Sequence, residues 1–216
     1  MGLFFNIPNN SNIVNENYII SKNDLYINFD KFESGKSNVL LVTGFSGSGK
    51  STLASQLAKK YKCEHYELDL LSFYFEGKFW GNNVDLDDLR MYEPGLAKFI
   101  NANNLVYGEV PDTKTQRQLF EKYIRFLIKY CKEQKDKKFI IEGVQLYEIF
   151  DKDKPQTTIY NNPLIIKGTS ALKSALQAAN RNSKDDDRSF LKEFPALLKW
   201  LLKDNSKLNK LIKSLN

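Results

Sequence analysis

Sulfur ligands, histidine and long apolar stretches are scarce in this sequence. Two cysteines, Cys63 and Cys131, lie far apart without a CxxC pair, and His65 is the single histidine. This composition argues against a disulfide-stabilised scaffold and against a Cys/His zinc site. Two isolated cysteines are typical of a reducing compartment, so we expect a cytoplasmic protein.

No apolar run reaches the roughly 18 residues that a membrane helix needs, and the first residues lack the features of a secretory signal. We therefore expect no membrane association. With 216 residues, 42% of them hydrophobic and 27% charged, the chain has the size and composition of one globular domain. The net charge of +6 permits polyanionic partners, but a nucleotide-binding site also needs positive charge.

Apolar runs and helical patterns alternate along the chain. The apolar runs predict strands over 39–43, 64–69, 138–142 and 163–167, with Thr157–Tyr160 as an alternative edge strand. Helical spacing of apolar residues predicts helices over 50–61, 113–131, 169–180 and 190–215, the last of them open to a break near Asp204 and Asn205. This alternation predicts an α/β fold with a mainly parallel sheet.

The N-terminal part has a different pattern. Two short apolar runs, Tyr18–Ile20 and Leu25–Phe29, flank the polar segment Ser21–Asp24 and predict a β-hairpin. We therefore divide the chain into an N-terminal hairpin extension, residues 1–37, and a main domain, residues 38–216.

One segment carries a specific chemical signature. Gly44-Phe-Ser-Gly-Ser-Gly49-Lys50-Ser51 matches the full GxxxxGK[ST] pattern and lies between a predicted strand and a predicted helix. Its glycines let backbone N–H groups turn toward phosphate oxygens, and the helix adds the positive end of its dipole. We expect Lys50 to reach the β- and γ-phosphates of ATP, and Ser51 to ligate Mg²⁺. The expected nucleotide-binding residues are Gly44, Ser46, Gly47, Ser48, Gly49, Lys50, Ser51 and Thr52.

Through this loop the chain resembles the P-loop small-molecule and nucleotide kinases. The loop is similar to those of adenylylsulfate, gluconate and uridine kinases. The layout of residues 38–190 is similar to that of zeta-toxin-like kinases, which phosphorylate a nucleotide sugar. The resemblance implies a three-layer P-loop NTPase fold, with ATP and Mg²⁺ as cofactors. It also implies an acceptor pocket in an insertion over about residues 70–125.

The resemblance further implies two functional carboxylates. Asp69, after the second strand, matches the base that orients the acceptor hydroxyl; capping the next helix is its alternative role. Glu142, before Gly143, matches a carboxylate that holds a magnesium-bound water or contacts the acceptor; pairing with a basic neighbour is the alternative. Glu67 is expected on the opposite face of a regular strand, and His65 is interpreted as structural.

Kinases of this kind close an arginine-bearing lid over the phosphates, because a guanidinium pairs with two phosphate oxygens and keeps its charge. The resemblance places the lid over about 169–190, with Arg181 in a catalytic role and Arg188 on the nucleotide. Both arginines flank Asp185–Asp187, and pairing with these acids in solvent is the alternative.

The acceptor segment is rich in aromatic and arginine side chains, although a single aromatic is more often part of the core. They suit stacking on a base or sugar and binding an acceptor phosphate. These side chains are Phe73, Tyr74, Phe75, Phe79, Trp80, Arg90, Tyr92, Tyr107, Arg117 and Arg125.

We therefore expect an ATP-dependent kinase that transfers the γ-phosphate to a hydroxyl or phosphate of a small molecule or nucleotide. One alternative is a polynucleotide 5′-hydroxyl kinase, which the basic charge and the lysine-rich C-terminal helix favour. The other is an NTP-hydrolysing switch or assembly ATPase that has no acceptor.

Overall fold

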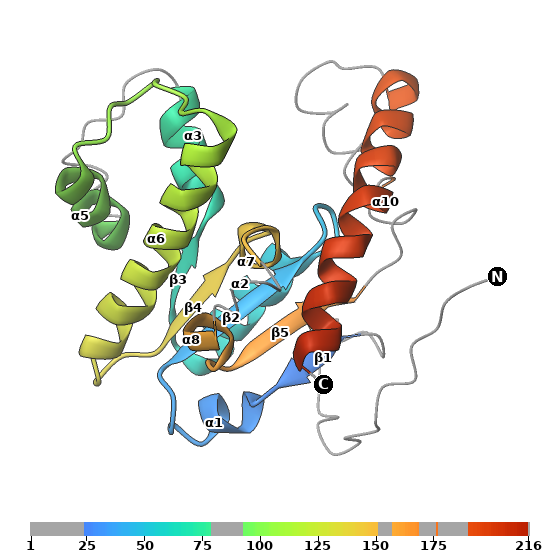
Figure 1. The fold of residues 1–216 in the computed structure, drawn as a ribbon. Helices are drawn as coiled ribbons and strands as arrows, with labels where there is room; N and C mark the ends of the chain where they lie inside the picture. Colours follow the sequence, from blue (N-terminus) through green and yellow to red (C-terminus); the bar gives the residue numbers. More distant parts are fainter. Residues whose placement is uncertain (1–23, 79–92, 151–156, 169–175, 177–189, 216) are drawn as a thin grey trace.

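The order of the strands in the sheet defines the architecture. The computed structural model describes residues 24–78, 93–150, 157–168, 176 and 190–215. In these ranges five strands form one sheet in the order β1-β5-β2-β4-β3; β2 to β5 run parallel, and β1 runs antiparallel to β5 (Figure 1). The strands are β1 (Leu25–Ile27), β2 (Val39–Gly44), β3 (Glu64–Glu67), β4 (Phe139–Glu142) and β5 (Leu164–Lys167).

Helices cover both faces of this sheet and give three layers (Figure 1). One face packs against α1 (Phe29–Glu33) and α2 (Lys50–Tyr61). The other face packs against α6 (Thr113–Glu133), α7 (Gln145–Glu148), α8 (Thr157–Tyr160) and α10 (Phe190–Leu215). Two further helices, α3 (Asp69–Glu76) and α5 (Pro94–Asn103), extend the second layer around α6. None of the helices in the described ranges is long and apolar enough to cross a bilayer.

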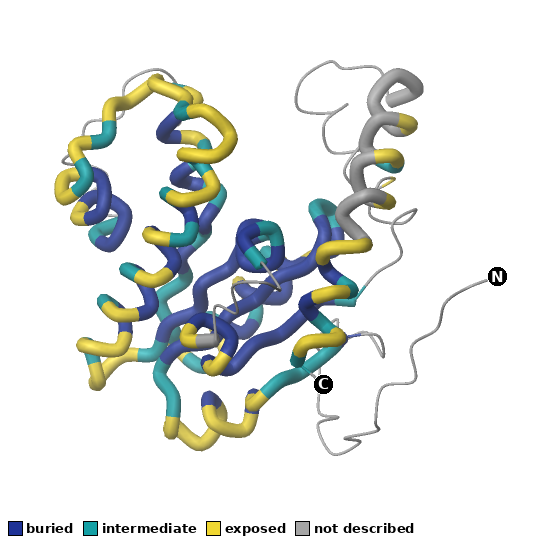
Figure 2. The backbone as a smooth tube through the Cα atoms, in the orientation of Figure 1, coloured by how far each residue is buried: buried dark blue, intermediate teal, exposed yellow. Residues whose placement is uncertain are grey.

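The central strand β2 shows why the sheet must be covered twice. Val39 and Leu41 face the core shared with α6, whereas Leu40 and Val42 face the core shared with α2. All four side chains are fully buried, and Figure 2 shows burial concentrated along the sheet and the helix faces against it. Burying each such side chain contributes about 1.5–3 kcal/mol, so neither layer of helices is dispensable.

The α/β architecture predicted from the sequence is confirmed. The predicted strands over 39–43, 64–69, 138–142 and 163–167, and the predicted helices over 50–61, 113–131 and 190–215, match observed elements within two residues at each end. Helix α10 continues through Asp204 and Asn205 without the break that we considered. Most of the predicted helix over 169–180 lies outside the described residues.

One expectation at the sheet edge is wrong, and another is confirmed with a shorter strand. Thr157–Tyr160 is the short helix α8 and not an edge strand, because β1 occupies the position beside β5. The predicted strand Leu25–Phe29 ends at Ile27, since Asn28 takes a left-handed conformation with φ of 52° and Phe29 begins α1. The proposed hairpin partner, Tyr18–Ile20, lies outside the described residues; the observed partner of β1 is β5.

A buried ion pair accompanies the pairing of β1 with β5. Asp24 Oδ2 accepts a hydrogen bond from Lys167 Nζ at 2.7 Å, and the two side chains are 0% and 5% exposed. Asp24 Oδ1 also accepts from the backbone N–H of Gly168 at 2.9 Å. Because neither charge can recover its hydration, the pair ties the N-terminal strand to the end of β5.

We predict that Asp24→Asn lowers the free energy of unfolding by about 3 kcal/mol or more, because the amide keeps the shape but removes the negative charge that the buried Lys167 ammonium contacts at 2.7 Å. The control is Glu64→Gln, which removes one partner of the exposed Lys137–Glu64 pair at 2.6 Å. Its loss should not exceed about 1 kcal/mol. Urea unfolding followed by circular dichroism measures both, and equal losses would contradict the prediction.

Candidate functional site

A glycine-rich loop joins the central strand β2 to helix α2 at the carboxyl edge of the parallel strands. Gly44, Gly47 and Gly49 have φ values of 151°, 76° and 85°, which residues other than glycine rarely adopt. A Cβ atom on Gly44 would lie 2.8 Å from the carbonyl oxygen of Lys167 and 2.9 Å from Ser48 Oγ. The loop can therefore pass this close to β5 only because position 44 is glycine.

One side of the glycine loop packs against the core, and its other side faces solvent. Phe45 is buried and its ring contacts Tyr147 of α7 edge to face, with ring centroids 6.1 Å apart. Ser48 is buried, its backbone N–H donates to the Phe45 carbonyl at 3.0 Å, and its hydroxyl has no hydrogen-bond partner among the described residues. Ser46 and Gly47 are half-buried, whereas Gly49 and Thr52 are exposed. The loop thus has a fixed base and a solvent-facing rim.

The first turn of α2 brings Lys50 and Ser51 against strand β4. Lys50 is 7% exposed, unusual burial for a lysine, and lies close enough to influence the pKa of Glu142. Ser51 Oγ donates a hydrogen bond to Glu142 Oε1 at 2.9 Å. Beside them, the buried Thr43 hydroxyl donates to the Gly143 carbonyl at 2.8 Å. The Ser51 bond ties α2 to the end of β4, and the Thr43 bond ties the end of β2 to the residue that follows β4.

Three carboxylates gather beside Lys50. Burial raises the pKa of Glu142 to about 7; repulsion from Glu67 and Asp69 adds to this, while Lys50 and the Ser51 hydrogen bond oppose it. Burial, followed by repulsion from Asp69, also raises the pKa of Glu67, and Lys50 opposes that shift. The three carboxylates therefore lie close enough for mutual repulsion to raise the pKa of Glu67 and of Glu142, and Lys50 offsets part of that repulsion.

Asp69 lies on the first turn of α3 rather than at the end of a strand. Strand β3 ends at Glu67, and Leu68 is already helical, with φ of −68° and ψ of −25°. The residue at the N-cap position is Leu68, so Asp69 does not occupy the capping position that was its alternative role. Asp69 Oδ1 instead accepts a hydrogen bond from Gln145 Nε2 at 2.7 Å, which fixes the direction of the carboxylate.

This local geometry corrects our expectation for Glu67. Residues two apart on a strand share a face, so the expectation that Glu67 points away from Asp69 is wrong. In the structure the chain turns helical at Leu68, and Glu67 and Asp69 both lie close enough to Glu142 to raise its pKa. Gln145 was not among the predicted site residues. Its position just after the Glu142-Gly143 pair was the available signal. A side chain on Gly143 would clash with Gln145 and would lie 2.8 Å from Leu68 Cβ, so this turn needs glycine to bring Gln145 to Asp69.

The acceptor-side candidates differ in exposure, in their hydrogen bonds to the rest of the protein and in whether the structure describes them. Phe73 and Tyr107 are exposed, at 41% and 36%, whereas Tyr74 and Phe75 are core residues. The guanidinium groups of Arg117 and Arg125 are engaged with the protein itself. Arg117 donates to the carbonyls of Ile149 and Phe150, and Arg125 donates to Glu121 and Thr158. The remaining candidates lie outside the described residues: Phe79, Trp80, Arg90, Tyr92, and the lid arginines Arg181 and Arg188.

Comparison with protein-family models yields no match for this chain, and comparison with curated proteins yields no significantly similar sequence. The functional interpretation therefore depends on the residues of the site and their arrangement.

We predict that Gly44→Ala destabilises the protein by about 2 kcal/mol more than Gly35→Ala. Both glycines have positive φ, but a Cβ at Gly35 meets nothing within 4 Å, whereas a Cβ at Gly44 meets the Lys167 backbone. The first change thus carries steric overlap in addition to backbone strain. Denaturant unfolding of both variants measures the difference. If Gly44→Ala lowers the free energy of unfolding no more than Gly35→Ala does, the close approach of Gly44 to the Lys167 backbone is refuted.

Proposed function

We propose that this chain is a P-loop phosphotransferase that uses ATP and Mg²⁺ to phosphorylate a small molecule or nucleotide. The observation that carries the proposal is the hydrogen bond from Ser51 to Glu142, which places a strand-end carboxylate at the base of the GxxxxGK[ST] loop. A phosphate-binding loop needs such an acidic neighbour to organise its metal ion. The central position of β2 supports the same interpretation, since ligands of doubly wound sheets bind at the carboxyl ends of the strands.

The loop and the helix behind it suit a triphosphate. Helix α2 begins at Lys50 and runs for 12 residues, so the positive end of its dipole points at the loop. The first turn of α2 contains no acidic residue that would compete for it. In this proposal the glycine backbone cradles the phosphates, and Lys50 supports the charge that develops on the transferred group.

Ser51 and Glu142 fit a magnesium ion. Mg²⁺ prefers oxygen ligands and retains several waters, and this pair offers one hydroxyl and one carboxylate. Glu142 Oε2 is buried and has no hydrogen-bond partner in the part of the chain that is described, which leaves it available to a bound ion or its water. Ser51 and Glu142 would hold the ion, and the bound ion would offset the phosphate charge during transfer.

Asp69 suits the role of orienting the acceptor hydroxyl and receiving its proton. It is half-buried near Glu142, and the bond from Gln145 leaves its second oxygen, Oδ2, for an acceptor. A positioned carboxylate of this kind typically contributes a factor of about 10²–10⁴ to the rate. Arg181 and Arg188 remain the proposed lid arginines, within residues that the structure does not describe.

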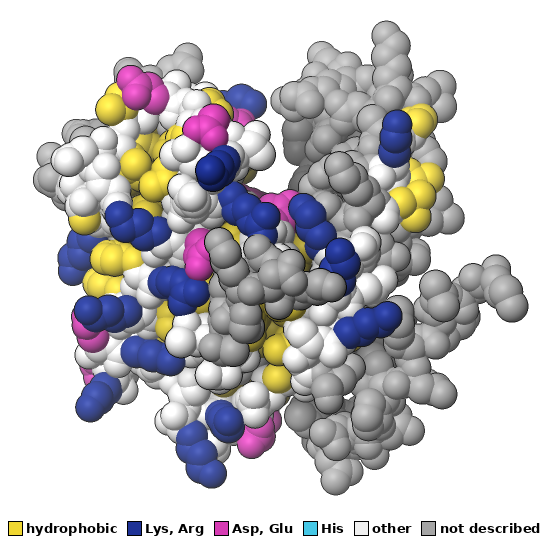
Figure 3. Space-filling view, in the orientation of Figure 1, with side chains coloured by type: hydrophobic (Ala, Val, Ile, Leu, Met, Phe, Trp, Pro, Cys, Tyr) yellow, Lys and Arg dark blue, Asp and Glu magenta, His cyan; other side chains and the backbone are white. Residues whose placement is uncertain are grey.

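The C-terminal helix gives little support to a nucleic-acid substrate. Leu208 and Leu211 of α10 are buried in the core, whereas Lys207, Lys210 and Lys213 are exposed, as on any amphipathic helix. Figure 3 shows lysine and arginine side chains spread over the visible face and interspersed with acidic and hydrophobic ones. A polynucleotide groove would instead be expected to gather basic side chains into one continuous track.

We predict that wild-type protein transfers label from γ-labelled ATP, in the presence of Mg²⁺, to one acceptor class in a panel. The panel contains nucleosides, nucleotides, sugars, nucleotide sugars and 5′-hydroxyl oligonucleotides. Lys50→Ala should abolish transfer, because it removes the buried cation next to the phosphates. The matched control is Lys59→Ala, which removes an exposed lysine from the same helix and should leave transfer unchanged.

Three results of this experiment would count against the proposal. If Lys50→Ala transfers label at the wild-type rate, the glycine loop has no part in the reaction. Label released only as free phosphate, with every acceptor class unlabelled, would favour an NTP-hydrolysing switch instead. Label in the oligonucleotide alone would identify a polynucleotide kinase.

We further predict that Asp69→Asn slows phosphoryl transfer by roughly 10²-fold or more while ATP binding changes by less than about threefold. The amide oxygen can still accept the bond from Gln145, so the side chain keeps its position but can no longer take a proton. Glu76→Gln, at an exposed carboxylate on the same helix, is the control and should behave as wild type. If Asp69→Asn abolishes ATP binding instead, Asp69 is part of the nucleotide site and not the base.

A further inference from the structure

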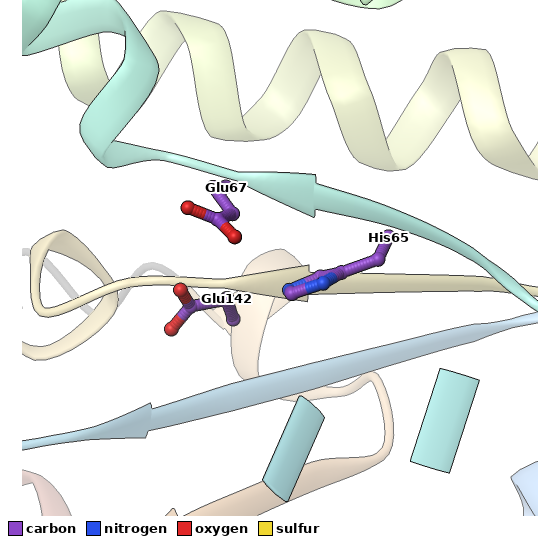
Figure 4. A group of neighbouring side chains, drawn as sticks. All are labelled: His65, Glu67 and Glu142. Carbon is purple, nitrogen blue, oxygen red and sulfur yellow. The ribbon is translucent and has the colours of Figure 1, made fainter. Parts of the chain in front are cut away.

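His65, Glu67 and Glu142 project from one face of the sheet into a shared space. His65 and Glu67 are two residues apart on β3 and so point to the same face, and Glu142 on β4 is the register partner of Glu67. One ring nitrogen of His65 and one oxygen of each carboxylate all lie within 4.8 Å of one another. Figure 4 shows the His65 ring extending along the strands toward the two carboxylates.

Two atoms of this cluster are buried without partners. Glu142 is 2% exposed; its Oε1 accepts from Ser51, whereas its Oε2 has no hydrogen-bond partner among the described residues. His65 Nε2 is also buried and has no partner within the same residues. Buried polar atoms are normally satisfied, so two unpartnered atoms on side chains that the cluster brings together point to a ligand between these side chains.

The donor set has the chemistry of a metal site. An imidazole binds metal through the lone pair of its neutral ring, and burial lowers the pKa of His65, which favours that neutral form. The two carboxylates bring negative charge to a region where Lys50 is the cation that acts on both of them. Ligands bound about 2.1 Å from one ion lie roughly 3–4 Å apart, so rotation of the flexible glutamate side chains closes the cluster around an ion.

We propose that His65, Glu67 and Glu142 bind a divalent transition metal ion, at a position distinct from the magnesium position at Ser51. The imidazole decides the class of metal, because Mg²⁺ prefers an all-oxygen shell whereas Zn²⁺, Co²⁺ and their neighbours accept nitrogen. Glu142 borders both positions, with Oε1 on Ser51 and Oε2 unpartnered. The site does not depend on nucleotide, because strand register and not the glycine loop brings its three ligands together.

The test is a Co²⁺ titration of the full chain, without nucleotide or affinity tag, followed by the visible absorption of the bound ion. We expect one Co²⁺ per wild-type chain, and a loss of affinity of about tenfold or more in His65→Gln and in Glu67→Gln. Glu64→Gln is the matched control: it removes a carboxylate from the same strand that pairs instead with Lys137, and affinity should stay within about twofold.

The single histidine of the sequence supplies a second readout. We expect Zn²⁺ to shift the NMR signals of the wild-type His65 ring and to stop their titration with pH. If the His65 ring signals do not shift when Zn²⁺ is added, the proposal is overturned. Equal Co²⁺ affinity in wild type and His65→Gln would also overturn it, as would no Co²⁺ binding by folded wild-type protein.

A further variant separates this site from the proposed magnesium position. Ser51→Ala should keep its Co²⁺ affinity within about threefold of wild type. If Ser51→Ala instead loses Co²⁺ binding while His65→Gln binds Co²⁺ as wild type does, the ion lies at Ser51 and the proposal is overturned. Circular dichroism and thermal unfolding in a chelator establish that each variant is folded. ATP binding and phosphoryl transfer are measured on the same preparations, so failure of the kinase and failure of the metal site are told apart.

Discussion

The placement of β2 between two parallel neighbours is the constraint on which the whole site depends. Parallel strands end at the same edge of a sheet, so the register of β2, β4 and β3 brings Gly44, Glu142 and Glu67 to one place. Close packing on both faces of β2 restrains this register, because a slip of one residue would exchange the side chains that each helical layer packs against and disturb both cores. The site is thus a consequence of core packing.

The charged groups at this edge lie against a buried core, which makes their burial costly. Glu142 is almost fully buried, with a raised pKa and one unpartnered oxygen, an arrangement that costs stability when nothing is bound. Lys50, Ser51 and the hydrogen bond from Gln145 to Asp69 keep these groups in fixed positions. A site that is costly in the free protein would gain on binding a cation, and this supports the metal ion and the phosphate ligand that we propose.

The N-terminal strand contributes to the same edge from the other side. Strand β1 pairs with β5, and the buried Asp24–Lys167 ion pair closes the end of that pairing. The carbonyl of Lys167 in turn approaches Gly44 so closely that only glycine fits. Residues 24–33 therefore belong to the framework that holds the glycine loop, through β5, and also contribute Phe29 and Phe32 to the core on the α2 face.

Local patterns in the sequence were sufficient for the elements and for the loop. The continuous apolar run of β2, the spacing of α2 and α6 and the GxxxxGK[ST] segment depend on neighbours in the chain, and each is where it was predicted. The edge of the sheet and the partners of the carboxylates were beyond such patterns. The pairing of β1 with β5 and the meeting of His65 with Glu142 arise between segments remote in sequence. At Leu68, where the strand gives way to a helix, the backbone N–H donates to the Glu142 carbonyl at 2.8 Å, also a contact between remote segments. Strand order and register decide those contacts, and they are set by packing of the complete sheet between its two layers of helices.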